Sequence, residues 1–209
     1  MYTWKGIAMM EDDAYFTRWV KQCGRLDHHQ GFLQALLPYL KGTVLDLGAN
    51  IGTHTHFYLQ HAEHVIAVEA NPPVYECLVH NCPEAKCINA AIGAESGHVS
   101  MSELSDGNYG AMYTIPGGTI PMITIDSLNL SACDFIKMDI EGAEIDGLQG
   151  GLETILKYKP IMCIECNAHT LCLQNKTPQD LINFIHYLGY TTSVRKPEDI
   201  SCDLICKPK

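Results

Sequence analysis

The sequence predicts an α/β fold in which helices cover a doubly wound, Rossmann-like sheet of about seven mostly parallel strands. Short apolar runs alternate with segments of helical periodicity from residue 43 to residue 92, and the alternation resumes at residue 135. Strands that alternate with helices pair in parallel through right-handed crossovers, and buried parallel strands are almost wholly apolar. We expect one domain over residues 1–209, with a helical N-terminal extension at 1–41 and the core at 42–209.

The composition indicates a folded chain and excludes some partners. Hydrophobic residues make up 46% of the 209 residues, which is enough to form a buried core. The formal net charge is −10, so nucleic acid and anionic membranes are repelled on average and neither is expected as a partner. The chain has no apolar run long enough for a membrane-spanning helix. Its ten cysteines are scattered through apolar segments, which favours a reducing, cytoplasmic location.

The first 92 residues predict two helices followed by alternating strands and helices. Apolar side chains recur at helical spacing near the N-terminus, Asp12 or Asp13 is placed to cap the first helix, and Gly24 ends it. The expected elements are helices at 14–23 and 29–40, a strand at 43–47, a helix at 51–61, a strand at 65–68, a helix at 72–82 and a strand at 87–91.

From residue 93 to residue 128 the apolar pattern shortens towards a period of two, with several glycines and two prolines. This pattern predicts a β-hairpin insertion built from runs at 98–103, 110–115 and 121–125. The α/β alternation then resumes. It predicts a strand at 135–138, an interrupted helix at 143–156, a strand at 161–165, a helix ending at 188 and a closing strand pair at 191–194 and 204–206.

The turn after the first core strand carries the sharpest local pattern. Gly48 allows a tight turn and the close approach of a ligand, and Gly52 lets the next helix start close to the sheet. Asp46 places a carboxylate near the end of the first core strand, and Glu69 ends the second. A carboxylate in the latter position can bind both hydroxyls of a ribose. Since ligands bind beyond the carboxyl ends of such strands, the pattern predicts a nucleoside site.

The same turn distinguishes between nucleoside cofactors. The GxGxxG and GxxxxGK[ST] patterns that cradle phosphates are absent, and Asp46 would be unfavourable beside a pyrophosphate. Beside a sulfonium cation with an α-amino group it is favourable, which indicates S-adenosylmethionine (SAM) rather than NAD. Three alternatives remain open: an NAD- or nucleotide-sugar-binding enzyme on a similar sheet, a non-catalytic SAM-binding module, and glycines that only shape the turn.

Carboxylates also follow the later core strands. Asp139 is the first choice for contact with the cofactor or the methyl acceptor, Glu165 is the second, and Glu141 lies in a loop that can line the acceptor pocket. Lys137 lies two residues before Asp139 on the same strand face, so we expect it to be a buried partner of a carboxylate. No metal is assigned. A Mg²⁺ site formed by Asp139, Glu165 and Asn167 is the less favoured alternative.

A longer pattern identifies a family. The chain has DFIKMDIEGAE at 134–144, LQGGL at 148–152 and PIMCIE at 160–165. With DLGANIG at 46–52, EANP at 69–72 and NAAIG at 89–93, these segments resemble the FkbM family of SAM-dependent methyltransferases. The resemblance covers about residues 43 to 167 and implies a class I methyltransferase fold, SAM as methyl donor and O-methylation of a small-molecule or carbohydrate acceptor.

The resemblance also implies a set of cofactor contacts. Glu69 is expected to take the ribose, with Ala70 and Asn71 beside it. Near the methionine part of SAM, the family pattern implies Asp46, Gly48, Ala49, Asn50 and Gly52. Near the adenine it implies Asn89, Ala90 and Ala91. Asp139 is expected to reach the cofactor from the neighbouring strand.

Overall fold

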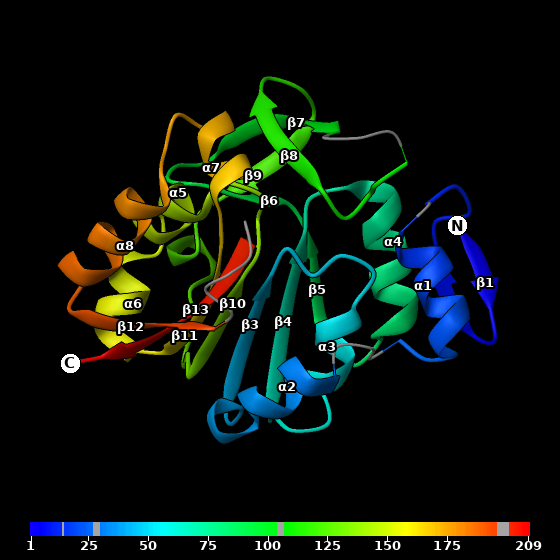
Figure 1. The fold of residues 1–209 in the computed structure, drawn as a ribbon, viewed down its shortest axis with the longest axis horizontal. Helices are drawn as coiled ribbons and strands as arrows, with labels where there is room; N and C mark the ends of the chain where they lie inside the picture. The colour runs from blue at the N-terminus through cyan, green and yellow to red at the C-terminus, as the bar shows by residue number, and fades with distance from the viewer. Residues whose placement is uncertain (14, 27–29, 104–106, 196–200) are drawn as a thin grey trace.

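The computed structural model describes residues 1–13, 15–26, 30–103, 107–195 and 201–209, and a seven-stranded sheet forms the centre of this part (Figure 1). The strands are β3 (Thr43–Leu47), β4 (His64–Glu69), β5 (Lys86–Asn89), β10 (Phe135–Met138), β11 (Ile161–Asn167), β12 (Tyr190–Arg195) and β13 (Ser201–Pro208). Their order across the sheet is β12-β13-β11-β10-β3-β4-β5.

The sheet is mixed. Strands β11, β10, β3, β4 and β5 pair in parallel, whereas β13 runs antiparallel to both β11 and β12. The predicted closing pair of strands therefore forms the antiparallel side of the sheet. The carboxyl ends of β3, β4, β10 and β11 meet at one edge, because parallel strands end on the same side.

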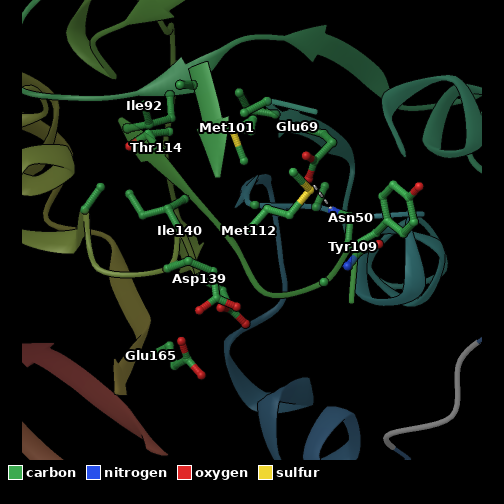
Figure 2. A pocket seen from close by; sticks show the side chains of 18 of the residues that line it. Asn50, Glu69, Ile92, Met101, Tyr109, Met112, Thr114, Asp139, Ile140 and Glu165 are labelled. Carbon is green, nitrogen blue, oxygen red and sulfur yellow. Dashed lines mark hydrogen bonds between the residues drawn. The ribbon is translucent and has the colours of Figure 1, made fainter. Parts of the chain in front are cut away.

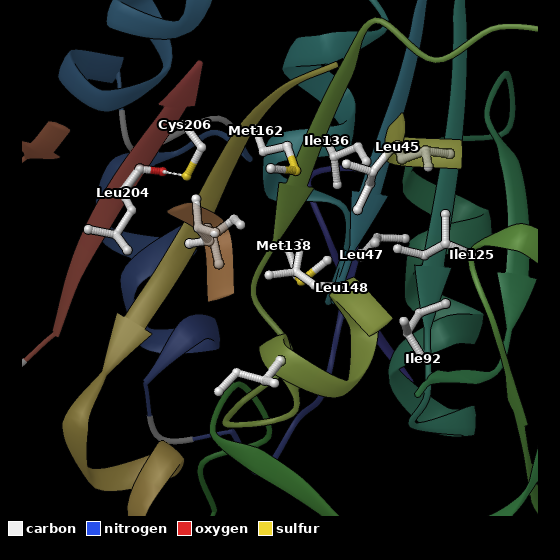
Figure 3. Packing of buried hydrophobic residues seen from close by; sticks show 14 of the residues in the cluster. Leu45, Leu47, Ile92, Ile125, Ile136, Met138, Leu148, Met162, Leu204 and Cys206 are labelled. Atoms are coloured by element: carbon white, nitrogen blue, oxygen red, sulfur yellow. Dashed lines mark hydrogen bonds between the residues drawn. The ribbon is translucent and has the colours of Figure 1, made fainter. Parts of the chain in front are cut away.

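Helices cover both faces of the sheet (Figure 1). Alternate strand residues point to opposite faces, so Leu45 and Ile136 pack on one side and Val44 and Phe135 on the other. The first face packs against α5 (Glu144–Gln149), α6 (Leu152–Tyr158), α7 (Ala168–Leu173) and α8 (Pro178–Tyr187), and Figure 3 shows part of this core. The second face packs against α2 (Gln30–Leu36) and α3 (Thr53–Tyr58).

The predicted hairpin insertion is present as a second, four-stranded sheet. Its strands are β6 (Ala91–Ile92), β7 (Gly97–Glu103), β8 (Met112–Pro116) and β9 (Ile120–Ile123), in the order β6-β9-β7-β8. Strand β7 pairs antiparallel with both β8 and β9, and β6 pairs parallel with β9. In Figure 1 this sheet lies beyond the upper ends of β4 and β5, on the side where the parallel strands end.

The prediction of a helical N-terminal extension is wrong for its first residues. These form an antiparallel hairpin of β1 (Tyr2–Trp4) and β2 (Ile7–Met9), and α1 (Phe16–Cys23) follows and ends at Gly24 as predicted. The side chain of Asn81, at the end of α4 (Pro72–Asn81), accepts a hydrogen bond from Ala8 N and donates one to Ala8 O, both at 2.8 Å. This distant contact stabilises a strand of only three residues.

Other expectations depend on single residues. Asp12 or Asp13 was expected to cap α1, but its N-cap residue is Tyr15, and the Oδ1 atom of Asp13 accepts hydrogen bonds from Tyr15 N and Phe16 N just before and at the start of the helix. Residues 14 and 29, where the two N-terminal helices were expected to begin, lie outside the described residues. Helix α7 was not predicted. None of the helices in the described ranges has the length and apolar character needed to span a membrane.

Candidate functional site

A cavity of about 270 Å³ opens where the parallel strands of the main sheet end (Figure 2). Its walls come from the turns after β3 and β4, the loop after β10 and the end of β11, and the insertion and α1 close it. The sequence-predicted residues in its wall are Gly48, Ala49, Asn50, Glu69, Ala70, Ala90, Ala91, Asp139, Glu141 and Glu165. This volume lies near the lower end of the range for small-molecule sites.

Gly48 brings the ends of β3 and β10 together. Its φ is +80°, a conformation that favours glycine. A Cβ atom at this position would overlap the carbonyl oxygen of Asp139 and lie 2.8 Å from the carbonyl carbon. Glycine is therefore required here by the approach of a neighbouring strand end and by the tight turn that the sequence predicted, while the predicted approach of a ligand stays a prediction. The same contact fixes the backbone of Asp139 beside the turn.

Four predicted cofactor residues do not line the cavity: Asp46, Gly52, Asn71 and Asn89. Asp46 is 1% exposed and accepts a hydrogen bond from Thr55 Oγ1 at 2.6 Å. Burial raises the pKa of Asp46 to about 6, although this bond and the charge of Lys137 oppose the shift. Asp46 is thus a buried group beneath the turn.

The other three residues, Gly52, Asn71 and Asn89, lie behind the cavity wall and support it. A Cβ atom at Gly52 would lie 2.6 Å from Cys82 Sγ, so this glycine allows α3 to approach the end of α4 rather than the sheet. Asn89 Nδ2 donates to the carbonyl oxygens of Glu69, at 2.8 Å, and Ala70, at 3.1 Å. Asn71 Nδ2 contacts the sulfur of Met112 at 2.9 Å. These side chains hold the turn after β4 in place.

Glu69 is held rigidly at the end of β4. Its Oε2 atom accepts a hydrogen bond from Asn50 N and its Oε1 atom accepts one from Asn71 N, both at 2.8 Å. Burial raises the pKa of Glu69 to about 7 despite these bonds. A backbone hydrogen bond from Ala70 also acts on this carboxylate, and its two oxygens offer about four acceptor positions in all, so capacity remains for a ligand hydroxyl.

Asp139, Glu141 and Glu165 bring carboxylate oxygens within 4.8 Å of one another. Figure 2 shows Asp139 and Glu165 on the same side of the cavity, away from Glu69. Burial and the negative charges of Asp139 and Glu144 raise the pKa of Glu141 to about 8. Burial also favours a raised pKa at Asp139, but the charge and the hydrogen bond of the adjacent Lys137 ammonium oppose this effect. The net result is a lowered pKa of Asp139. The cluster therefore combines a stable anion with a group that binds protons near neutral pH.

The expected role of Lys137 is confirmed. Its Nζ atom lies 3.0 Å from Asp139 Oδ2 and 3.7 Å from Asp203 Oδ1 on β13. The alternative Mg²⁺ site considered from the sequence included Asn167. In the structure the side chain of Asn167 instead caps α7, where it accepts a hydrogen bond from His169 N at 3.0 Å. The oxygen atoms that lie close together here belong to the three carboxylates, an atom type that Mg²⁺ accepts.

Part of the cavity wall was not predicted. It comes mainly from the insertion, where Met101, Met112 and Thr114 line the cavity. The further residues are Phe16, Thr53, His54, Val68, Ile92, Tyr109, Gly110, Ile140 and Ala143. Phe16, Met101, Met112 and Thr114 belong to none of the sequence motifs, since they reach the cavity only through the packing of distant segments.

The matching family model is described as the methyltransferase FkbM domain and spans residues 46–192. The chain therefore belongs to the FkbM methyltransferase family, and the resemblance found in its motifs is confirmed. No curated protein matches the chain in sequence. Because the family consists of methyltransferases and SAM and SAH complexes occur among the structural neighbours below, SAM is supported as the cofactor.

Several solved structures similar to this chain are methyltransferases. The FkbM methyltransferase from Methylobacillus flagellatus has a TM-score of 0.57 and 21% identity, over 78% of this chain and 43% of that one. This chain thus spans less than half of that protein. The precorrin-6y C5,15-methyltransferase from Geobacter metallireducens has a TM-score of 0.54 and 13% identity, over 88% and 90% of the two chains. The DhpI–SAH complex has a TM-score of 0.53 and 14% identity, over 95% and 90%. Identities this low support a shared fold.

Proposed function

We propose that this protein transfers a methyl group from SAM to a hydroxyl group of a small molecule or sugar. The main support is the meeting of four strand ends at one cavity, which brings together the Gly48 turn, Glu69 and the Asp139–Glu141–Glu165 cluster. The structures of DhpI with SAH, and with SAM and HEP, support the choice of cofactor.

The cavity residues fit SAM chemically. Glu69 lies in the cavity wall and keeps acceptor capacity for a ribose hydroxyl beside its backbone hydrogen bonds. The anionic Asp139 suits a ligand that carries a sulfonium and an ammonium group, because opposite charges attract strongly in a partly buried site. In this proposal Gly48, Ala49 and Asn50 lie along the methionine part and Ala90 and Ala91 near the adenine. Asp46, Gly52, Asn71 and Asn89 support them from behind, and Ala70 flanks the ribose.

SAM supplies an activated methyl group when bound, and the protein must hold the acceptor oxygen in line with it. Positioning of this kind supplies much of the rate acceleration. We assign proton removal from the acceptor to Glu141, because a base is most effective when its pKa lies near the working pH. Glu165 and Asp139 complete the wall around the acceptor hydroxyl.

Calorimetric titration with SAM tests the cofactor assignment. We expect wild-type protein to bind SAM and Glu69→Gln to bind it about 10- to 100-fold more weakly, the equivalent of one hydrogen bond to a charged group. Glu76→Gln, on the exposed side of α4, is the matched control and should bind like wild type. If folded wild-type protein binds NAD or a nucleotide sugar but no SAM, the proposal is wrong.

Transfer of a labelled methyl group to a panel of alcohols, sugars and amines then tests the reaction. Methylation of a hydroxyl compound, reduced strongly by Glu141→Gln, is the expected result. Methylation of amines alone would contradict the O-methyl assignment. SAM binding without transfer to any compound in a broad panel would favour a non-catalytic binding module.

A further inference from the structure

Lys137 is a buried cation at the centre of the main sheet. It is 1% exposed and does not line the cavity. In the sheet register it lies between Asp46 on β3 and Cys163 on β11, on the face covered by α2 and α3. Its ammonium group contacts Asp139, which borders the cavity, and Asp203, on the antiparallel strand β13.

The surroundings keep this charge fixed. Burial alone would lower the pKa of Lys137, but the carboxylates of Asp139 and Asp203 reverse the shift and raise it. The titratable groups that interact with Lys137 or with Asp139 are Asp46, His54, Tyr58, Glu141, Glu144, Cys163, Glu165 and Asp203. Burial raises the pKa values of Tyr58 and Cys163 well above their usual range, so both stay neutral. The ammonium is thus balanced by carboxylates from different strands.

We infer that Lys137 is a positioning residue, whose ammonium group holds the Asp139 carboxylate as an anion at the cavity wall while Asp203 holds the ammonium from β13. The 3.0 Å contact engages Asp139 Oδ2 from behind the wall, which restricts rotation of the carboxylate. The Asp139 side chain is 35% exposed, so it meets the cavity, whereas the Lys137 side chain is 2% exposed and does not. Lys137 therefore acts on a ligand through Asp139.

This inference rests on the proposed function only for the identity of the ligand that Asp139 meets. It explains why a costly buried cation is kept in the centre of the sheet. Without a cationic partner, the Asp139 carboxylate would tend to take up a proton, because burial disfavours its charged form. With Lys137 in place, the negative charge of the cluster is kept on Asp139, whose backbone carbonyl adjoins the Gly48 turn.

The test follows the carboxyl-carbon NMR signal of Asp139 as the pH is changed, and the Asp139→Asn variant identifies that signal. The titration is carried out on wild-type protein, on Lys137→Met and on Lys137→Gln. The exposed Lys86→Met variant is the control. We expect both Lys137 variants to raise the titration midpoint of Asp139 by at least about one pH unit, a tenfold change in proton affinity. Lys86→Met should leave the midpoint unchanged. A midpoint equal to that of wild type in a folded Lys137 variant would overturn the inference.

Two further measurements complete the test. If neither Lys137 variant folds, wild-type protein decides, because an Asp139 midpoint above the ordinary value of about 4 contradicts the inference. In the folded variants, SAM affinity should fall where the pH lies below the shifted midpoint of Asp139 and recover as the pH rises above it. The NMR titration needs no ligand, so a wild type that fails to bind SAM would contradict the proposed function alone.

Discussion

Replacing Gly48 with alanine should separate two strand ends that carry the candidate site. The residue has a φ of +80°, and an added Cβ atom would overlap the carbonyl oxygen of Asp139. The left-handed backbone conformation costs a non-glycine residue about 1–2 kcal/mol. Relief of the overlap adds about 1–3 kcal/mol, as in other overpacked sites. We therefore expect Gly48→Ala to lower the free energy of unfolding by about 2–5 kcal/mol.

Gly189→Ala is the matched control. Gly189 has a similar φ of +85°, but no heavy atom lies within 4 Å of the position its Cβ atom would take. This variant should therefore lose only the conformational part, about 1–2 kcal/mol. Urea unfolding of both variants measures the difference, and thermal unfolding should place Gly48→Ala about 4–20 °C below wild type. Equal losses in the two variants would refute the assigned contact between the Gly48 turn and Asp139.

Two other predictions concern the stability of the free protein. Folding raises the pKa of Glu141 to about 8. Between about pH 4.5 and pH 8 the folded protein therefore binds more protons than the unfolded chain. As a result, the free energy of unfolding should fall as the pH rises through this range. Urea unfolding at pH 5.5 and pH 7.5 should show a smaller fall in Glu141→Gln than in wild type, and an equal fall would contradict the assignment. Thr177→Ala removes the capping box that begins α8, in which Asp180 N donates a hydrogen bond to Thr177 Oγ1. Urea unfolding of this variant should show a free energy of unfolding about 1 kcal/mol lower than that of wild type, with SAM binding unchanged. A loss of SAM affinity in this variant would show that α8 affects the cavity.

The parts of the site that follow from strand ends were predictable from the sequence. Glu69 and Asp139 each terminate a run of apolar residues, and parallel strands must end on the same side of a sheet. Lys137 was expected to pair with a carboxylate because residues two apart on a strand share a face. The structure agrees on all three positions.

The position of the Asp46 side chain was not correctly predicted from the strand ends. Its carboxylate was expected at the strand end, but β3 continues to Leu47, and the alternation of side chains directs Asp46 to the face covered by α3. The N-terminal hairpin and the wall formed by Met101 and Met112 depend on contacts with distant segments. Local periodicity contains no information about such contacts.

The charges around the cavity connect the fold to the proposed chemistry. Burial raises the pKa values of Asp46, Glu69 and Glu141, so each of these groups makes the ionised, ligand-free site less stable. A cationic ligand would offset this cost, because it favours the charged form of nearby carboxylates. A ligand with a pyrophosphate group would add negative charge to the same cavity. The electrostatics of the site therefore favour a positively charged adenosyl donor over a dinucleotide, independently of the motifs.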